Sequence, residues 1–143
     1  MTMSSPRANS PDPVAAFRRA DQLLSRHRPL EALDALRTAL RPGDPADSTD
    51  ASVHLLAGRA YLDSAQLRKA EAAFHRVIEI EPADHYARFA LGKTLQRQGR
   101  LTEAETQLKM ASAMDPRPEY QEALGEIRAR IALSGDRPSD PKS

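Results

Sequence analysis

Apolar residues recur along this chain at the spacing of one helix face, and no stretch alternates apolar and polar residues long enough to form a strand. The first apolar segment contains Val14, Phe17 and Leu24, and the next contains Leu30, Leu33, Leu36 and Leu40. This recurrence places the side chains on one side of an amphipathic helix. Most proline and glycine residues fall between such segments. The pattern therefore predicts an all-α protein.

The first predicted helix has a recognisable start, and both ends of the chain look different from the rest. Asp12 can accept a hydrogen bond as an N-cap, and Pro13 suits the first helical position because its missing N–H has no partner there. Residues 1–12 and 135–143 are rich in serine and proline and contain little apolar surface to bury. We expect these two segments to be disordered tails.

The chain also repeats itself with a period of 34 residues. A shift of 34 superimposes five identical residues, namely Gly58 on Gly92, Leu67 on Leu101, Ala70 on Ala104, Glu71 on Glu105 and Pro82 on Pro116. Conservative pairs accompany them, among which are Leu55 with Phe89, Arg59 with Lys93 and Phe74 with Leu108. A period of this length is typical of helical hairpins joined end to end.

The matched positions have packing roles. Gly58 and Gly92 fall in the middle of predicted helices, where glycine costs about 1 kcal/mol relative to alanine. A second helix that approaches the backbone closely would explain this cost. Ala70 and Ala104, twelve residues later, are the small partners expected on that second helix. A proline at the same distance in both copies should end the second helix.

Short turns are expected between the two helices of each copy. They cover residues 64–66 and 98–100. Gly99 can adopt the left-handed conformation that ends a helix. Thr102 and Glu105 have the spacing of a capping box, which predicts the start of the next helix.

The two copies resemble tetratricopeptide repeats. Residues 51–84 carry the resemblance at Gly58, Tyr61, Ala70, Phe74 and Pro82, and residues 85–118 carry it at Leu91, Gly92, Leu95, Ala104, Leu108, Ala111 and Pro116. Residues 13–50 look like a degenerate first repeat with an extended linker, and residues 119–134 look like a capping helix with one polar face. The resemblance implies an all-α solenoid of three helix-turn-helix hairpins with a C-terminal capping helix.

The amino-acid composition argues against several classes of function. Lys plus Arg is 21 and Asp plus Glu is 20, and the resulting net charge of +1 argues against a dedicated nucleic-acid binder. The chain has no cysteine, which excludes disulfides and thiolate metal sites. The longest apolar run, residues 14–17, is far shorter than the roughly 20 residues of a membrane helix. We expect a cytoplasmic protein without membrane insertion, and the preference for arginine over lysine is typical of a GC-rich bacterial genome.

Catalytic patterns are not evident in the sequence. The four histidines, His27, His54, His75 and His85, fall in different predicted helices and lack a metal-binding spacing such as HExxH. The glycines do not form a phosphate-binding loop, and no serine lies in a nucleophile elbow. We therefore expect neither an enzymatic activity nor a cofactor or metal site.

The resemblance also implies a surface for a partner. In this family the first helix of each hairpin lines the concave side of the solenoid, which here would present Phe17, Leu55, Arg59, Tyr86, Phe89, Lys93 and Arg97, with Tyr120 added by the capping helix. Arg59, Lys93 and Arg97 form a basic row. Stacking would bring these like charges together, and an anionic partner would balance them. The alternative is that they are solvated charges paired with Asp63 or nearby glutamates.

We therefore expect a non-catalytic protein–protein interaction module, a scaffold or adaptor that binds an acidic peptide or a helix of a partner protein in the groove. The chaperone-binding carboxylate clamp of the family is disfavoured, because its lysine, asparagine and arginine positions are occupied here by Phe17, Asp21, Leu56, Tyr86 and Ala90. A dedicated cytoplasmic chaperone for a secreted or assembling substrate is the alternative function. The sequence leaves the partner and the oligomeric state open.

Overall fold

The computed structural model describes residues 13–39 and 50–135, which form seven α-helices and no strand. The helices are α2 (Pro13–Ser25), α3 (Pro29–Ala39), α4 (Ala51–Asp63), α5 (Leu67–Ile80), α6 (His85–Arg97), α7 (Leu101–Met114) and α8 (Pro118–Ser134). The all-α prediction is confirmed. The predicted tails at residues 1–12 and 136–143, and the predicted linker residues 40–49, lie outside the described residues.

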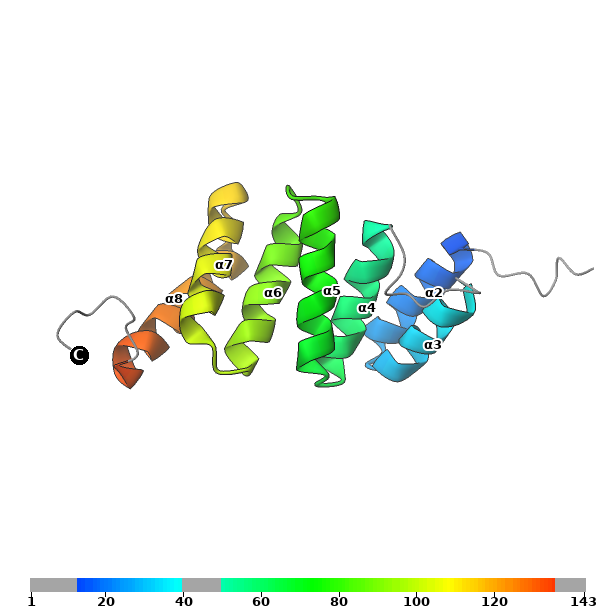
Figure 1. Cartoon of the computed structure of the whole chain (residues 1–143), viewed down its shortest axis with the longest axis horizontal. Helices are drawn as coiled ribbons and strands as arrows, with labels where there is room; N and C mark the ends of the chain where they lie inside the picture. Colours follow the sequence, from blue (N-terminus) through cyan, green and yellow to red (C-terminus); the bar gives the residue numbers. More distant parts are fainter. Residues whose placement is uncertain (1–12, 40–49, 136–143) are drawn as a thin grey trace, which may run out of the picture.

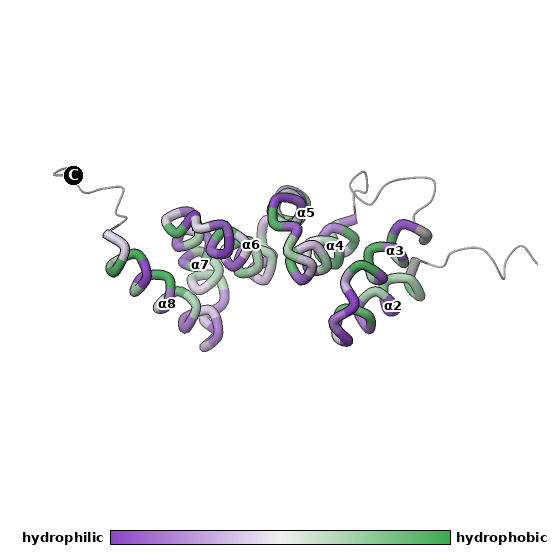
Figure 2. The backbone as a smooth tube through the Cα atoms, turned by 90° about the horizontal axis from the view of Figure 1, so that it is seen from below, coloured by the Kyte–Doolittle hydropathy of each residue, from purple (hydrophilic) through white to green (hydrophobic). Residues whose placement is uncertain are grey.

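Consecutive helices pack as hairpins, α2 with α3, α4 with α5 and α6 with α7, and α8 packs on the last hairpin (Figure 1). The hairpins stack side by side, so that α3 lies against α4 and α5 lies against α6. Seen along the helices, the stack is an arch (Figure 2). Helices α3 and α5 lie toward its outer side, and α2 and α4 lie toward its inner side, here called the concave side.

The mid-helix glycines lie where two helices approach each other closely. A Cβ atom added to Gly58 would lie 2.6 Å from Cε1 of Phe74, and one added to Gly92 would lie 2.7 Å from Cγ of Leu108. The close approach expected from the sequence is therefore present. The nearest group at Gly58 is the ring of Phe74, however, and not the methyl group of Ala70, because the ring fills the space that the missing side chain leaves.

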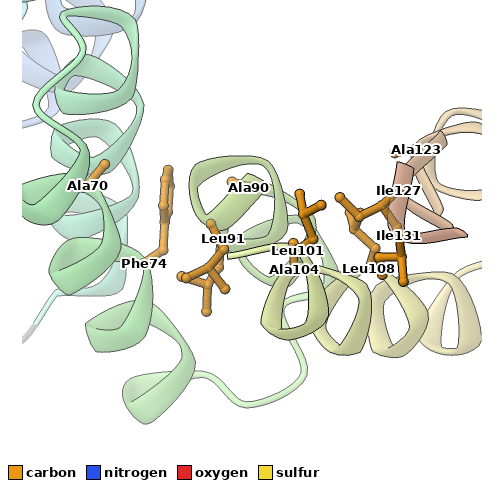
Figure 3. Packing of buried hydrophobic residues seen from close by; sticks show 11 residues of the cluster. Ala70, Phe74, Ala90, Leu91, Leu101, Ala104, Leu108, Ala123, Ile127 and Ile131 are labelled. Carbon is orange, nitrogen blue, oxygen red and sulfur yellow. The ribbon is translucent and has the colours of Figure 1, made fainter. Parts of the chain in front are cut away.

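Two hydrophobic clusters form the core, and α4 contributes to both. The larger cluster joins α5, α6, α7 and α8, with Phe74 facing Leu91, and with Leu108 facing Ile127 of α8 (Figure 3). The smaller cluster joins α2 and α3 to the Leu56 side of α4. The first hairpin is thus held to the rest of the stack through one helix, and that helix carries Arg59 on the concave side.

The three turns inside the hairpins share one left-handed geometry. The residues with positive φ are His27 (60°), Ala65 (62°) and Gly99 (79°). The following amide N–H in each turn donates to a carbonyl five residues earlier, namely Arg28 to Leu23 at 2.8 Å, Gln66 to Tyr61 at 2.8 Å and Arg100 to Leu95 at 3.0 Å. This is the hydrogen bond of a Schellman motif, which satisfies carbonyls left open at a helix end. The conformation expected for Gly99 is confirmed.

The capping box expected at Thr102 is wrong. Helix α7 begins at Leu101, with Arg100 at the N-cap and no side-chain hydrogen bond to the cap. The helix begins before the threonine because the Schellman turn ends at Arg100, so Thr102 is already inside the first turn.

The Arg100 guanidinium instead links two second helices. Its Nη1 lies 2.8 Å from Oε1 of Glu71 on α5, and its Nη2 lies 2.8 Å from Oε2 of Glu103 on α7. The Gln98 amide also donates to Glu71 Oε1 at 3.0 Å. Burial alone would raise the pKa of Glu71, but the hydrogen bonds from Gln98 and Arg100 and the charge of Arg100 lower it below the ordinary value. This network holds the end of α6 against α5.

Replacing Gly58 by alanine should lower the free energy of unfolding by roughly 1–3 kcal/mol, because the added methyl group overlaps the buried Phe74 ring. Gly125 is the matched control, since it also lies inside a helix but has no neighbouring atom within 4 Å of an added Cβ. Gly125→Ala should raise the stability by about 1 kcal/mol through helix propensity. Urea unfolding measures both values, and a gain of equal size at both positions would contradict the close approach.

Replacing Ala65 by glycine should raise the stability by roughly 1 kcal/mol, because alanine is strained at the positive φ that this turn requires. The same change at Ala72, an exposed position inside α5, should lower the stability by about 1 kcal/mol. Thermal unfolding of the two variants gives opposite shifts of Tm if the turn geometry is as described. A decrease for both variants would show that the turn is not left-handed.

The Glu71 network should make stability depend on acid pH. Because the pKa of Glu71 is lowered by folding, its contribution is present at neutral pH and is lost as the pH falls through the folded-state pKa. Unfolding midpoints measured from neutral pH to about pH 3 should therefore fall less steeply for Glu71→Gln than for the unaltered protein. Arg100→Gln should show the same reduced slope, because it removes the charge that lowers the pKa. Identical slopes for all three proteins would contradict this assignment.

Candidate functional site

The first helices of successive hairpins lie next to one another along the concave side, since α2 contacts α4 and α4 contacts α6. The starts of α4 and α6 are fixed by two aspartates, 34 residues apart. The Asp50 carboxylate accepts from the Ser52 amide at 2.9 Å, and the Asp84 carboxylate accepts from the Ala87 amide at 2.9 Å. Because both helices begin at the same point of the repeat, equivalent residues of α4 and α6 lie at the same level of the stack.

The structure gives the three cations of the predicted basic row different surroundings. Arg59 Nη1 lies 2.9 Å from Oδ1 of Asp21, an ion pair that crosses from α4 to α2. Arg97 Nη1 donates to the carbonyl oxygen of Leu62 at 2.9 Å, from α6 to the end of α4. Lys93 is half-buried and forms no ion pair or hydrogen bond within residues 13–39 and 50–135. Arg59 therefore pairs with Asp21, and not with Asp63, which the sequence had suggested as an alternative partner.

Tyr86 is the aromatic residue that remains open on this side, with 37% of its surface exposed. Its ring centroid lies 6.1 Å from that of Phe89. Burial raises the pKa of the Tyr86 phenol, the charge of Arg59 lowers it, and the carboxylate of Asp63 raises it further. The charge of Arg59 on α4 therefore acts on the pKa of the phenol on α6.

The other apolar residues nominated by the sequence are half-buried in packing. Phe17 packs against the smaller core cluster, and Leu55 and Phe89 pack against the larger one. The ring of Phe89 stacks on Tyr120, with centroids 4.7 Å apart and an interplanar angle of 23°. These three residues support the helices that carry the basic row and expose only part of their surface.

Tyr120 does not line the concave side, contrary to the expectation for the capping helix. It is fully buried, because α8 folds back and places its ring beneath Phe89. Burial also raises the pKa of its phenol. The predicted surface therefore loses its contribution from α8.

Tyr120 belongs to a polar cluster that sequence reasoning missed. Its hydroxyl lies 2.9 Å from Nδ1 of His85, and Nε2 of His85 lies 3.2 Å from Oδ2 of Asp115. Arg117 donates to the same Asp115 oxygen at 2.6 Å and lies over the Tyr120 ring, 5.7 Å from its centroid. The partners of His85 are 30 and 35 residues away in sequence, and only their shared position at the boundary between repeats could have indicated the contact. The cluster fixes α8 to the start of α6.

Two other kinds of site find no support in the part of the chain that the structure describes. No group of three or more His, Asp or Glu side chains gathers there in a way that could hold a metal ion. None of the helices described is both long and apolar enough to cross a membrane.

The comparisons with known proteins agree with this architecture. A family model described as tetratricopeptide repeat matches residues 66–127. No curated protein sequence matches the chain significantly.

Solved structures resemble the fold over most of the chain. The first tetratricopeptide-repeat domain of the human RPAP3 protein has a TM-score of 0.76 at 15% identity, over 86% of this chain and 94% of that domain. MamA has a TM-score of 0.75 at 16% identity, over 89% of this chain and 71% of that chain. The second tetratricopeptide-repeat domain of human RPAP3, solved in complex with the HSP70 peptide SGPTIEEVD, has a TM-score of 0.71 at 17% identity, over 81% of this chain and 94% of that domain.

At these identities the structural likeness establishes the fold, and the family model establishes the repeats in the C-terminal half. The chain therefore contains tetratricopeptide repeats over residues 66–127 and has the tetratricopeptide-repeat fold across its described helices.

Proposed function

We propose that this protein is a non-catalytic interaction module, a scaffold or adaptor, whose concave side binds an acidic peptide segment of a partner protein. The observation that carries the proposal is the state of Lys93. The residue is half-buried among the first helices, and its side chain forms no ion pair or hydrogen bond with the described residues. A carboxylate from a partner could therefore pair with this ammonium group without first breaking a contact inside the protein.

The surroundings of Lys93 favour a peptide over a small anion. Arg59 occupies the equivalent position on the neighbouring helix, and Tyr86, seven residues before Lys93 on α6, exposes an aromatic surface. Cations beside an exposed aromatic ring can contact both acidic and apolar side chains of one extended segment. An aromatic residue and an arginine are also the types that contribute most often to binding energy at protein interfaces.

The solved relatives give limited support. The RPAP3 domain bound to the HSP70 peptide shows that this fold can hold a segment rich in acidic residues. This chain has no comparable clamp residues, because Phe17 and Asp21 occupy two of the clamp positions, and Leu56 and Ala90, at two others, are buried. We therefore propose an acidic peptide held by Lys93 and Arg59, and not a chaperone tail held by a clamp.

The double substitution Arg59→Glu with Lys93→Glu should weaken peptide binding roughly tenfold or more, because it replaces both attractive charges by repulsive ones. A displayed library of random peptides would be selected on the unaltered protein, and the affinity of the selected peptides would be measured by calorimetry. Selected sequences should be enriched in Asp and Glu.

The matched control is Arg68→Glu with Lys109→Glu, which reverses two exposed charges on the second helices α5 and α7. This control should bind the selected peptides as the unaltered protein does, and circular dichroism should show equal helicity for all three. Binding that survives the change at Arg59 and Lys93, or that falls equally in the control, would overturn the proposal. A partner that is insoluble without this protein would instead indicate the chaperone function.

A further inference from the structure

We infer that Asp21 is an internal competitor for the partner's carboxylate at Arg59 and so limits the affinity and selectivity of the concave side. The inference rests on the proposed function, because it concerns regulation of the same surface. It assigns a role to a residue of the first hairpin that is neither in the predicted basic row nor in the core.

The position of Asp21 supports this role. Asp21, Arg59 and Lys93 are at equivalent places on α2, α4 and α6, so the row begins with one carboxylate and continues with two cations. The carboxylate reaches only the nearest cation, with Asp21 Oδ1 2.9 Å from Arg59 Nη1. Arg59 is therefore occupied by the protein itself, while Lys93 is not.

The contact has the properties of an exchangeable one. The side chains of Arg59 and Asp21 are 31% and 62% exposed, and one nitrogen and one oxygen form the bond. An exposed ion pair of this kind changes the equilibrium constant of folding or binding by less than about fivefold. A guanidinium can bind a carboxylate through two parallel N–H groups, which is stronger than the single contact to Asp21. An incoming carboxylate can therefore displace Asp21 without disturbing the core.

The consequence is a difference between the two cations. Lys93 can bind an acidic group without an internal competitor, whereas at Arg59 a partner's carboxylate must compete with Asp21. A segment with a single acidic residue gains one ion pair, and a segment with several gains a second by displacing Asp21. Asp21 thereby reduces the gain in affinity that a second acidic residue would bring.

The substitution Asp21→Asn tests this role, because it keeps the size of the side chain and removes its charge. A fluorescein-labelled peptide of eight glutamates serves as the probe, and the corresponding peptide of eight glutamines controls for contacts that need no charge. Fluorescence anisotropy at low ionic strength should show roughly two- to fivefold tighter binding of the glutamate peptide to the variant.

The control variant is Glu79→Gln, which removes a comparable exposed ion pair, 3.0 Å from Glu79 Oε1 to Arg76 Nη1, on the second helix α5. It makes the same change in net charge, so its affinity for the glutamate peptide should stay close to that of the unaltered protein. Equal gains for Asp21→Asn and Glu79→Gln would show that net charge alone is responsible, and would overturn the inference.

A second pair of measurements links the effect to Arg59. Asp21→Asn should bring no gain in a protein that already carries Arg59→Gln. A gain that persists in that background would overturn the inference. If the unaltered protein binds the glutamate peptide and Asp21→Asn does not change the affinity, the inference fails and the proposed function stands. If none of these proteins binds the glutamate peptide, the inference and the proposed function both fail.

Discussion

The close packing of two helix pairs, α4 with α5 and α6 with α7, at a mid-helix glycine is the contact on which the rest of this structure depends. At Gly58 the ring of Phe74 occupies the volume that any larger residue would need, and at Gly92 the side chain of Leu108 does the same. These two hairpins can close because these positions lack a side chain, and in the first hairpin the small, buried Ala20 occupies the equivalent position. Closed hairpins then stack, and the stack places α2, α4 and α6 side by side on the concave side. The proposed binding surface is thus a consequence of packing inside the hairpins.

The concave side is neutralised in part by the protein itself. Asp21 holds Arg59, and the carbonyl of Leu62 holds Arg97, so two of the three cations have partners from a neighbouring helix. These contacts also join one hairpin to the next. A row of like charges is therefore compatible with stacking, because one cation is paired with a carboxylate and another donates to a backbone carbonyl. Lys93, the third cation, has no ion pair or hydrogen bond among the described residues.

A shared fold does not transfer a binding site. The RPAP3 domains have nearly the same backbone arrangement over most of this chain, yet identity stays between 15% and 17% in the two human domains compared. The positions that determine the stack in this chain, such as Gly58, Ala70 and Phe74, are small or apolar because packing requires it. Positions that face a partner are free to differ, and here Phe17 and Asp21 stand where the family's chaperone clamp requires basic or amide groups. The partner must therefore be inferred from the side chains of this protein.

The sequence by itself determined the helices, their pairing and the turn at Gly99, because these depend on contacts within a few residues or on a period that is visible as repetition. It also nominated Arg59, Lys93 and Tyr86. The tertiary structure alone decided which charges are paired and that Tyr120 is buried beneath Phe89. The reason is physical: the pattern of a helix specifies which face is apolar, whereas an ion pair or a ring contact between distant residues depends on the angle and distance at which whole helices stack.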